Sequence, residues 1–205
     1  MGILVNNHLC SGSSKLKGAP IFESLFSPQD FTTIVYSDPK DYVTKYWTAY
    51  KALGYRNNSL NGQIFEFIIE TLLIREGIVP FYTQAEMSFI PAVKYDVILY
   101  SRDKIGVKPY SLSLKTSCRE RWKQADLEAE ALKKVHRRAM CYLLTISAKE
   151  AKNVQAKIRS SKAFALDRVV DCLSDDINVL CKELRSVQFD YNEDLPVIKS
   201  GQCAP

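Results

Sequence analysis

Apolar residues recur at helical spacing in three stretches of the chain. Residues 61–76 carry apolar side chains at positions 64, 65, 68, 69, 72 and 73, which predicts a helix that ends before Gly77. Asp38-Pro39 and the residues 41–53 that follow predict a shorter helix that ends at Gly54. A third helix is predicted over residues 119–138, and its apolar stripe consists of Trp122, Ala125, Ala129, Leu132 and Val135.

Between these helices the pattern changes to alternation, which is typical of strands. In the predicted second strand, Leu112 and Leu114 face one side of the sheet, whereas Ser113 and Lys115 face the other. The predicted elements are a strand over 95–100, a polar turn over 102–106, a strand over 110–115 and a buried strand over 141–146.

The C-terminal third predicts helices over 148–159 and 162–187. The second is expected to break near Leu173-Ser174, where Ser174 with Asp175 can cap a new helix. Residues 1–18 and the tail 191–205, which carries Pro196 and Gly201, are expected to be loose. The chain therefore predicts one α/β domain, a small mixed sheet flanked by helices, with its core in 60–146 and C-terminal helices in 148–190.

Composition narrows the class of protein. The 205 residues are 46% hydrophobic and 25% charged, as expected of one globular domain. A net charge of +5 is compatible with a nucleic acid partner without requiring one. We expect a cytoplasmic protein, because the sequence has neither a long apolar run nor a secretory signal. The six cysteines are irregularly spaced, and His8 and His136 lie far apart, which argues against zinc and disulfide frameworks.

The candidate chemistry begins with Asp96 and Lys115, on the two strands of the predicted hairpin. A carboxylate there can hold a divalent ion, which polarises a phosphate and activates water. A neighbouring lysine can stabilise developing charge or help to orient or deprotonate the water. The alternative is a purely structural role, in which Asp96 caps a turn and Lys115 is a solvent-exposed lysine at the end of a strand.

The pair resembles the PD-(D/E)xK nucleases, whose pattern is an Asp on one strand and Asp/Glu-x-Lys on the next. The sequence departs from that pattern at Tyr95, which precedes Asp96, and at Ser113, which has no carboxylate. One branch of restriction endonucleases, which includes EcoRII, PspGI, SsoII and NgoMIV, has Ser/Val-x-Lys and carries the missing acid on the next helix. The resemblance implies that Glu128 takes this role and that Asp96, Lys115 and Glu128 are catalytic.

That branch also carries Arg-Glu/Asp-Arg after the lysine as its reader of CC and GG. The matching residues are Arg119, Glu120 and Arg121. An arginine can donate to guanine O6 and N7, and a glutamate can accept from cytosine N4. Taken alone, such a run is more often a solvated helix start. Arg121, Gln124 and Glu128 share one face of the predicted helix.

Five further residues are additional or competing candidates. In the family, a helix before the Asp strand often supplies a metal ligand, and Gly62-x-x-Phe-Glu66 favours Glu66 over Glu70. On the helix of Glu128, both Asp126 and Glu130 are competing acids. Trp47 could stack on a base turned out of the duplex, although packing is the more common role of such an aromatic residue.

Together the resemblances imply a restriction-endonuclease-like core and a type II restriction endonuclease that cuts duplex DNA at a palindrome containing CC and GG. Mg²⁺ is the implied cofactor, with Asp96, Glu128 and Glu66 as ligands. A palindrome favours a homodimer, and a restriction role implies a prokaryotic host and a partner DNA methyltransferase. Two alternatives stay open: a structure-specific repair or mobile-element nuclease of the same superfamily, and a non-catalytic DNA-binding protein.

Overall fold

The computed structural model of the chain describes residues 2–10, 16–26, 33–90, 92–191 and 198–204. No helix within these ranges is both long and apolar enough to cross a membrane. The elements in these ranges are α1 (Ile3–Asn6), α2 (Gly18–Ser24), α3 (Pro39–Ala52), α4 (Asn58–Arg75), β1 (Phe81–Met87), β2 (Tyr95–Asp103), β3 (Gly106–Leu114), α5 (Arg121–Val135), β4 (Met140–Thr145), α6 (Ala148–Arg159), β5 (Arg168–Asp171), α7 (Asp176–Arg185) and β6 (Ile198–Ala204).

Side-chain caps fix the starts of the two long N-terminal helices. The Asp38 side chain accepts a hydrogen bond from the backbone N–H of Asp41 at the start of α3. Asn57 caps α4 in the same way through the N–H of Leu60. After α4, Gly77 adopts a φ of +67°, a left-handed conformation that glycine reaches without steric cost. Both predicted helices are confirmed, and each begins slightly earlier than the apolar pattern suggested.

The strands form one six-stranded mixed sheet in the order β5-β4-β3-β2-β1-β6. Strands β3, β4 and β5 are parallel to one another, and the remaining neighbours pair antiparallel. The predicted hairpin of β2 and β3 is confirmed, with Val97 opposite Leu112. This register brings Asp96, at the start of β2, beside the end of β3. The mixed α/β architecture predicted from the sequence is therefore confirmed.

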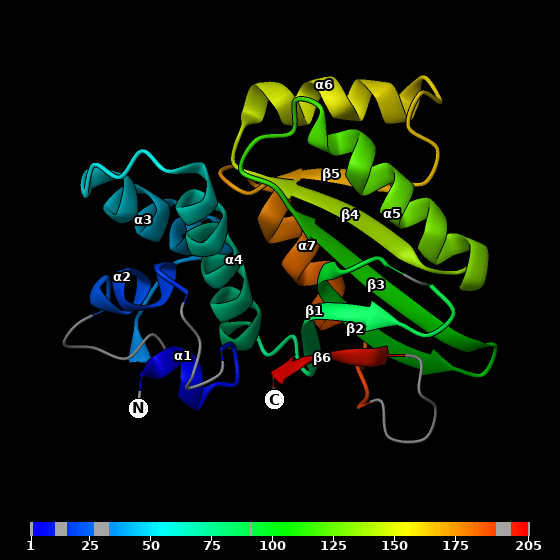
Figure 1. The fold of residues 1–205 in the computed structure, drawn as a ribbon, viewed down its shortest axis with the longest axis horizontal. Helices are drawn as coiled ribbons and strands as arrows, with labels where there is room; N and C mark the ends of the chain where they lie inside the picture. Colours follow the sequence, from blue (N-terminus) through cyan, green and yellow to red (C-terminus); the bar gives the residue numbers. More distant parts are fainter. Residues whose placement is uncertain (1, 11–15, 27–32, 91, 192–197, 205) are drawn as a thin grey trace.

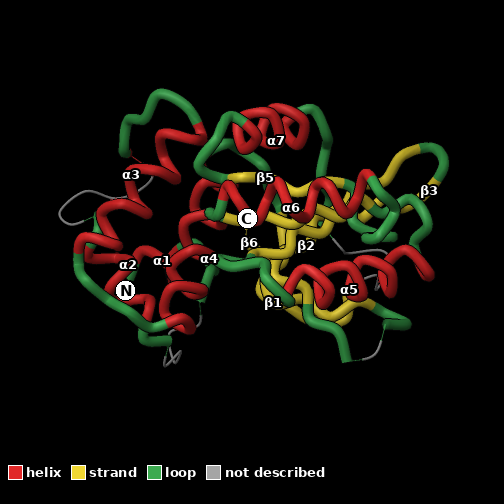
Figure 2. The backbone as a smooth tube through the Cα atoms, turned by 90° about the horizontal axis from the view of Figure 1, so that it is seen from above, coloured by secondary structure: helices red, strands yellow, loops and turns green. Residues whose placement is uncertain are grey.

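Helices cover both faces of the sheet, and each face has its own apolar core. On one face α5 and α6 pack over β4 through residues such as Ala129, Val154 and Leu143. On the other face α7 and α4 pack through residues such as Leu180 and Leu144. Figure 1 shows α1–α4 grouped at the end of the sheet toward which β3, β4 and β5 point. Figure 2 shows α5 and α6 running side by side across the sheet.

The helix predicted over 162–187 is wrong in its first half. Residues Arg168–Asp171 form β5, which pairs parallel with β4, and a helix, α7, begins only at Asp176. The reason is tertiary: Val169 and Val170 are buried on opposite faces of the sheet, a placement that β-branched residues suit. The expected break near Ser174 marks the turn between β5 and α7.

The two loose ends predicted from composition are also wrong where the structure describes them. Leu4 and Leu9 are buried in the core beneath α4, so the N-terminal segment is anchored by apolar packing. Residues 11–15 of the predicted arm lie outside the described residues. At the other end, Ile198–Ala204 forms β6 and pairs with β1, which itself carried no clear strand signal. Pairing between β1 and β6 satisfies the backbone hydrogen bonds of both strands. Amino-acid composition does not predict such a long-range pairing.

Candidate active site

Asp96 and Lys115 meet where β2 begins and β3 ends. The Lys115 ammonium group donates to Oδ2 of Asp96 at 2.6 Å, and the two side chains are only 8% and 13% exposed. The backbone N–H of Leu114 donates to the same oxygen at 2.7 Å. The structure thus brings Asp96 and Lys115, the two residues predicted to meet on the hairpin, together in a largely desolvated ion pair.

Ser113 lies beside this pair on the same face of β3 as Lys115. Its side chain is buried, and its Oγ atom has no hydrogen-bond partner within the described residues. The hydroxyl carries no negative charge, so β3 adds no second carboxylate to Asp96. Any further acid at this position must come from the neighbouring helices.

Glu66 and Glu70 approach the pair from α4. Burial and then the negative charge of Asp96 raise the pKa of Glu66 to about 7, while Lys115 and Arg121 act to lower it. Glu70 lies one turn further along the helix and is fully buried, with Oε2 unpartnered within the described residues. Burial, with the charges of Glu66 and Asp96, raises the pKa of Glu70 well above its ordinary range. With a pKa of about 7, Glu66 can ionise near neutral pH.

Glu128 approaches from α5 on the other side. Burial raises its pKa, the hydrogen bond from Gln124 and the charge of Lys115 lower it, and Asp96 raises it again. Gln124 Nε2 donates to Glu128 Oε1 at 2.8 Å, so these two residues do share a helix face. The Tyr95 hydroxyl donates to the backbone carbonyl of Glu128 at 3.1 Å and ties α5 to β2.

The two competing acids on α5 have other partners. The Asp126 carboxylate accepts backbone N–H groups from Phe164, Ala165 and Leu166, and so fixes the loop that leads into β5. Glu130 pairs with Lys134 on the same helix at 2.9 Å. The pKa of Glu128, in contrast to these fixed partners, is shifted by the charges of Asp96 and Lys115, so Glu128 is the candidate acid on this helix.

The site therefore contains carboxylates from three elements around one lysine. Glu66 on α4 and Glu128 on α5 both sense the charges of Asp96, Lys115 and Arg121. Within the described part of the chain, no three His, Cys, Asp or Glu side chains are gathered closely enough to hold a metal ion. The donor chemistry nevertheless suits a hard divalent cation, because positive charge would stabilise the carboxylates of Glu66 and Glu128, whose pKa values are raised in part by Asp96.

The three residues Arg119, Glu120 and Arg121 lie at the start of α5 and differ in their surroundings. Arg121 opens the helix and its charge acts on Glu66 and Glu128, toward the acidic group. Arg119 is 89% exposed, and its Nε lies 3.9 Å from Glu150 Oε1 on α6. Glu120 is fully exposed, and a 2.6 Å hydrogen bond from Lys123 lowers its pKa. The three side chains thus project from one turn. Arg121 acts on Glu66 and Glu128, whereas Arg119 and Glu120 are exposed to solvent.

Glu150 is a residue that sequence reasoning missed. Its carboxylate accepts hydrogen bonds from the backbone N–H of Cys118 and from the Ser117 hydroxyl at 3.2 Å. These contacts fix the segment that joins Lys115 to α5. A glutamate in the first turn of a helix is so common that no sequence signal marks this role.

Trp47 takes the packing role. It lies on α3, with its ring 5.4 Å from that of Tyr50 and 6.2 Å from that of Phe65, centroid to centroid. Lys51 lies 5.8 Å over the Trp47 ring. These contacts make Trp47 part of the aromatic packing between α3 and α4, so nothing in its surroundings indicates a base-stacking role.

Comparisons with known proteins give one match. No protein-family model matches the chain, and no curated protein matches it in sequence. Among solved structures, a complex of restriction endonuclease PspGI with substrate DNA matches with a TM-score of 0.42 and 19% sequence identity. The match covers 76% of this chain and 65% of that chain, slightly less than two thirds of its length.

Proposed function

We propose that this chain is a magnesium-dependent endonuclease that hydrolyses phosphodiester bonds of duplex DNA. The observation that carries the proposal is the desolvated Asp96–Lys115 ion pair at the β2–β3 end, with Glu66 and Glu128 within electrostatic reach of it. A surface ion pair made for stability would not need two further partly buried acids around it. Perturbed carboxylates that cluster around one lysine are typical of catalytic sites.

Asp96, Glu128 and Glu66 are the residues that would hold the metal ion. Bound there, Mg²⁺ supplies Lewis-acid polarisation of the phosphate and lowers the pKa of a coordinated water. Glu66 is preferred to Glu70 because Glu70 lies deeper in the core, where only 3% of its surface is exposed.

Lys115 then acts directly on the reacting groups. Its ammonium group is held in place by Asp96 Oδ2 at 2.6 Å. From that position the charge of Lys115 stabilises the negative charge that develops on the phosphate oxygens, and its N–H groups orient the attacking water. Because the side chain is only 8% exposed, this charge is weakly screened and acts strongly at short range.

We further propose a type II restriction activity at a palindrome that contains CC and GG. Arg119, Glu120 and Arg121 would read the bases, with Glu120 exchanging its Lys123 partner for a cytosine amino group. Arg121 and Glu128 lie about 10 Å apart along α5 at 1.5 Å per residue, so one rigid helix links base reading to the metal. A palindromic site favours a homodimer, and host DNA would need a partner methyltransferase.

The test is cleavage of supercoiled plasmid with Mg²⁺, compared with the same reaction in EDTA. We expect discrete fragments whose sequenced ends fall at one CC/GG-containing palindrome. Nicked and branched duplexes of the same sequence serve as competing substrates. Preferential cleavage of a junction would transfer the proposal to the structure-specific nucleases, and no metal-stimulated cutting of any duplex would overturn it.

A further inference from the structure

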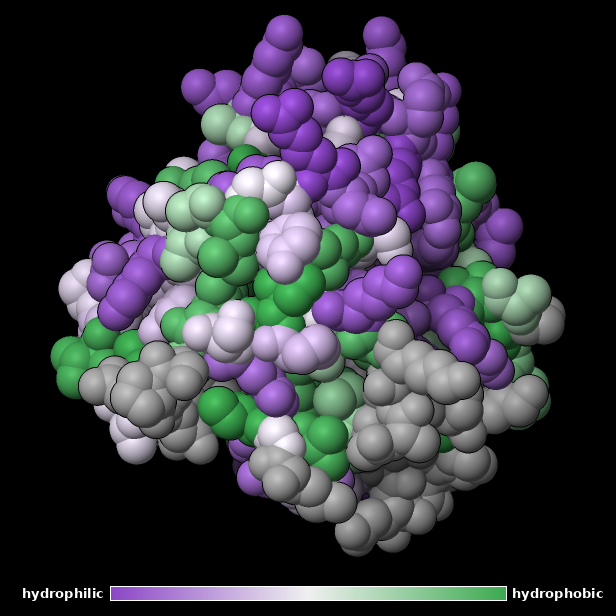
Figure 3. Space-filling view, turned by 60° about the vertical axis from the view of Figure 1, so that its left-hand side comes forward, coloured by the Kyte–Doolittle hydropathy of each residue, from purple (hydrophilic) through white to green (hydrophobic). Residues whose placement is uncertain are grey.

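One short segment of this chain carries a marked excess of positive charge. Residues 148–162, which comprise α6 and the turn after it, carry a net charge of +4 out of +5 for the whole chain. The cations are Lys149, Lys152, Lys157, Arg159 and Lys162, and the one acid is Glu150. Figure 3 shows hydrophilic residues gathered at the top of the molecule, where Figure 1 places α6. Such a bias is not needed for folding, since α6 buries only Ala151 and Val154.

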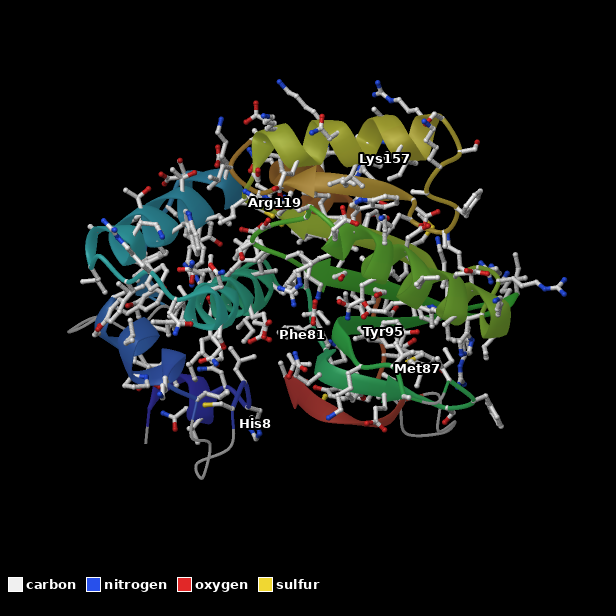
Figure 4. The ribbon with its side chains drawn as sticks, turned by 45° about the horizontal axis from the view of Figure 1, so that its top comes forward. His8, Phe81, Met87, Tyr95, Arg119 and Lys157 are labelled. Atoms are coloured by element: carbon white, nitrogen blue, oxygen red, sulfur yellow. The ribbon has the colours of Figure 1, made fainter. Side chains whose placement is uncertain are left out.

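A groove of about 720 Å³ lies between α6 and the start of α5. Arg119, Lys123, Lys149, Lys157 and Lys162 line it, together with Trp122 and Glu150. Figure 4 places Arg119 at the N-terminal end of α5 and Lys157 on the neighbouring α6. The two acids of the lining, Glu120 and Glu150, are engaged by Lys123 and by the Ser117–Cys118 segment. The groove therefore presents an excess of positive charge.

The walls of the groove are held in place by contacts that do not depend on a ligand. The Lys157 ammonium group lies 5.1 Å over the Trp122 ring, an attraction between a cation and an aromatic face. The backbone N–H of Lys162 donates to the Lys157 carbonyl at 2.8 Å. The loop after Lys162 is fixed by the Asp126 carboxylate. Cations ordered before binding lose less entropy when an anion arrives.

We propose that this groove binds the sugar–phosphate backbone of duplex DNA next to the cleaved site. The inference rests on the proposed function, which identifies the bound polyanion as DNA. It adds a DNA-contacting surface apart from the acids Asp96, Glu66 and Glu128. The 12 residues of α6 span about 18 Å, which is long enough to run past more than one phosphate of a strand. Such contacts position the duplex without reading its sequence.

The groove reaches the segment that joins Lys115 to α5, because Cys118 and Arg119 line it. Cys118 lies three positions after Lys115 in the chain, and the Glu150 carboxylate accepts a hydrogen bond from its backbone N–H. Arg119 lines the groove next to the turn from which Arg121 faces Glu66 and Glu128. A strand that follows α6 therefore arrives at the base-reading turn and then at the acids.

The test compares the salt dependence of binding for a triple groove variant, Lys149→Ala with Lys157→Ala and Lys162→Ala, and wild type. Binding is measured with Ca²⁺ in place of Mg²⁺ on duplexes of about 30 base pairs, one with a CC/GG palindrome and one random. We expect affinity to fall about tenfold for both duplexes, and the slope of log K against log salt to shrink by about 2 to 3.

The matched control removes the same number of charges elsewhere, through Lys51→Ala, Lys104→Ala and Lys182→Ala on α3, the β2–β3 turn and α7. The control should keep the wild-type slope. An equal loss in both triple variants would mean that only net charge matters, and an unchanged groove variant would mean that DNA does not contact α6; either result overturns the inference. Failure of wild type to cut DNA refutes the proposed function alone, because binding with Ca²⁺ does not require cleavage.

Discussion

The ammonium group of Lys115 and the N–H of Leu114 converge on a single oxygen, Oδ2 of Asp96, at 2.6 and 2.7 Å. One atom thereby fixes the start of β2 against the end of β3. The same carboxylate raises the pKa of Glu66 and of Glu128. Its two partners are unequal, since Lys115 balances its charge and Leu114 supplies only a dipole.

This inequality predicts different costs for the two single substitutions. Asp96→Ala leaves the Lys115 ammonium buried without its partner, and should lower the free energy of unfolding by about 2–4 kcal/mol. Lys115→Ala leaves Asp96 with the Leu114 N–H and should cost about 1–2 kcal/mol. Urea denaturation of both variants and of the double variant measures their coupling.

The exposed pair Lys40–Asp175, at 3.1 Å, provides the matched control for this cycle. Its side chains are 42% and 80% exposed, so water screens the pair and the coupling should stay below about 1 kcal/mol. Equal coupling in the two cycles would contradict the special environment of Asp96 and Lys115.

Glu66 predicts a dependence of stability on pH. Because its pKa in the fold is about 7 rather than the ordinary 4.5, the protonated form favours the folded state. Wild type should therefore lose about 1–3 kcal/mol of unfolding free energy, relative to Glu66→Gln, as the pH rises from about 4.5 through 7. Urea denaturation of both proteins at pH 5 and pH 8 measures this difference. Parallel pH curves for the two proteins would show that Glu66 is not perturbed.

Glu128 predicts a sharp contrast along α5. Glu128→Gln removes the charge that senses Asp96 and Lys115, so Mg²⁺-dependent plasmid cleavage should fall by at least about 100-fold. The matched variant is Glu130→Gln, whose carboxylate pairs with Lys134 and should be dispensable for cutting. Equal cleavage by the two variants would place the second acid of the site elsewhere.

Arg119 predicts a loss of specificity without a loss of stability. Its side chain is 89% exposed, so Arg119→Ala should change the free energy of unfolding by less than about 0.5 kcal/mol. Discrimination between a CC/GG duplex and a random one should fall by about 1–3 kcal/mol. Competition binding with Ca²⁺ measures it; a uniform loss on both duplexes would make Arg119 a phosphate contact instead.

The elements with strong local periodicity could be predicted from the sequence. The β2–β3 hairpin, α4, α5 and β4 all have patterns in which packing and propensity agree, and they carry Asp96, Lys115 and Glu128. The first half of the helix predicted over 162–187 was wrong because pairing of Val169 and Val170 with β4 outweighs local pattern. β6 was missed because edge pairing with β1 is a long-range property.

Within the candidate site, the order of residues along the chain indicated which groups could meet, but not how they are solvated. The preference for Glu66 over Glu70 gains physical support from the depth of Glu70 in the core. The separation of Arg121 from Arg119 depends on how the turn before α5 is held by Glu150, a contact between residues more than 30 positions apart. No local pattern carries that information.

The most direct test of the proposed chemistry is single-turnover cleavage by Lys115→Ala, with binding measured separately with Ca²⁺. Lys134→Ala, which removes an exposed cation of α5, is the control. The account predicts that Lys115→Ala binds the duplex within about threefold of wild type and cleaves it at least about 100-fold more slowly with Mg²⁺. Cleavage by Lys115→Ala at the wild-type rate would contradict the assignment of the Asp96–Lys115 pair as the catalytic centre.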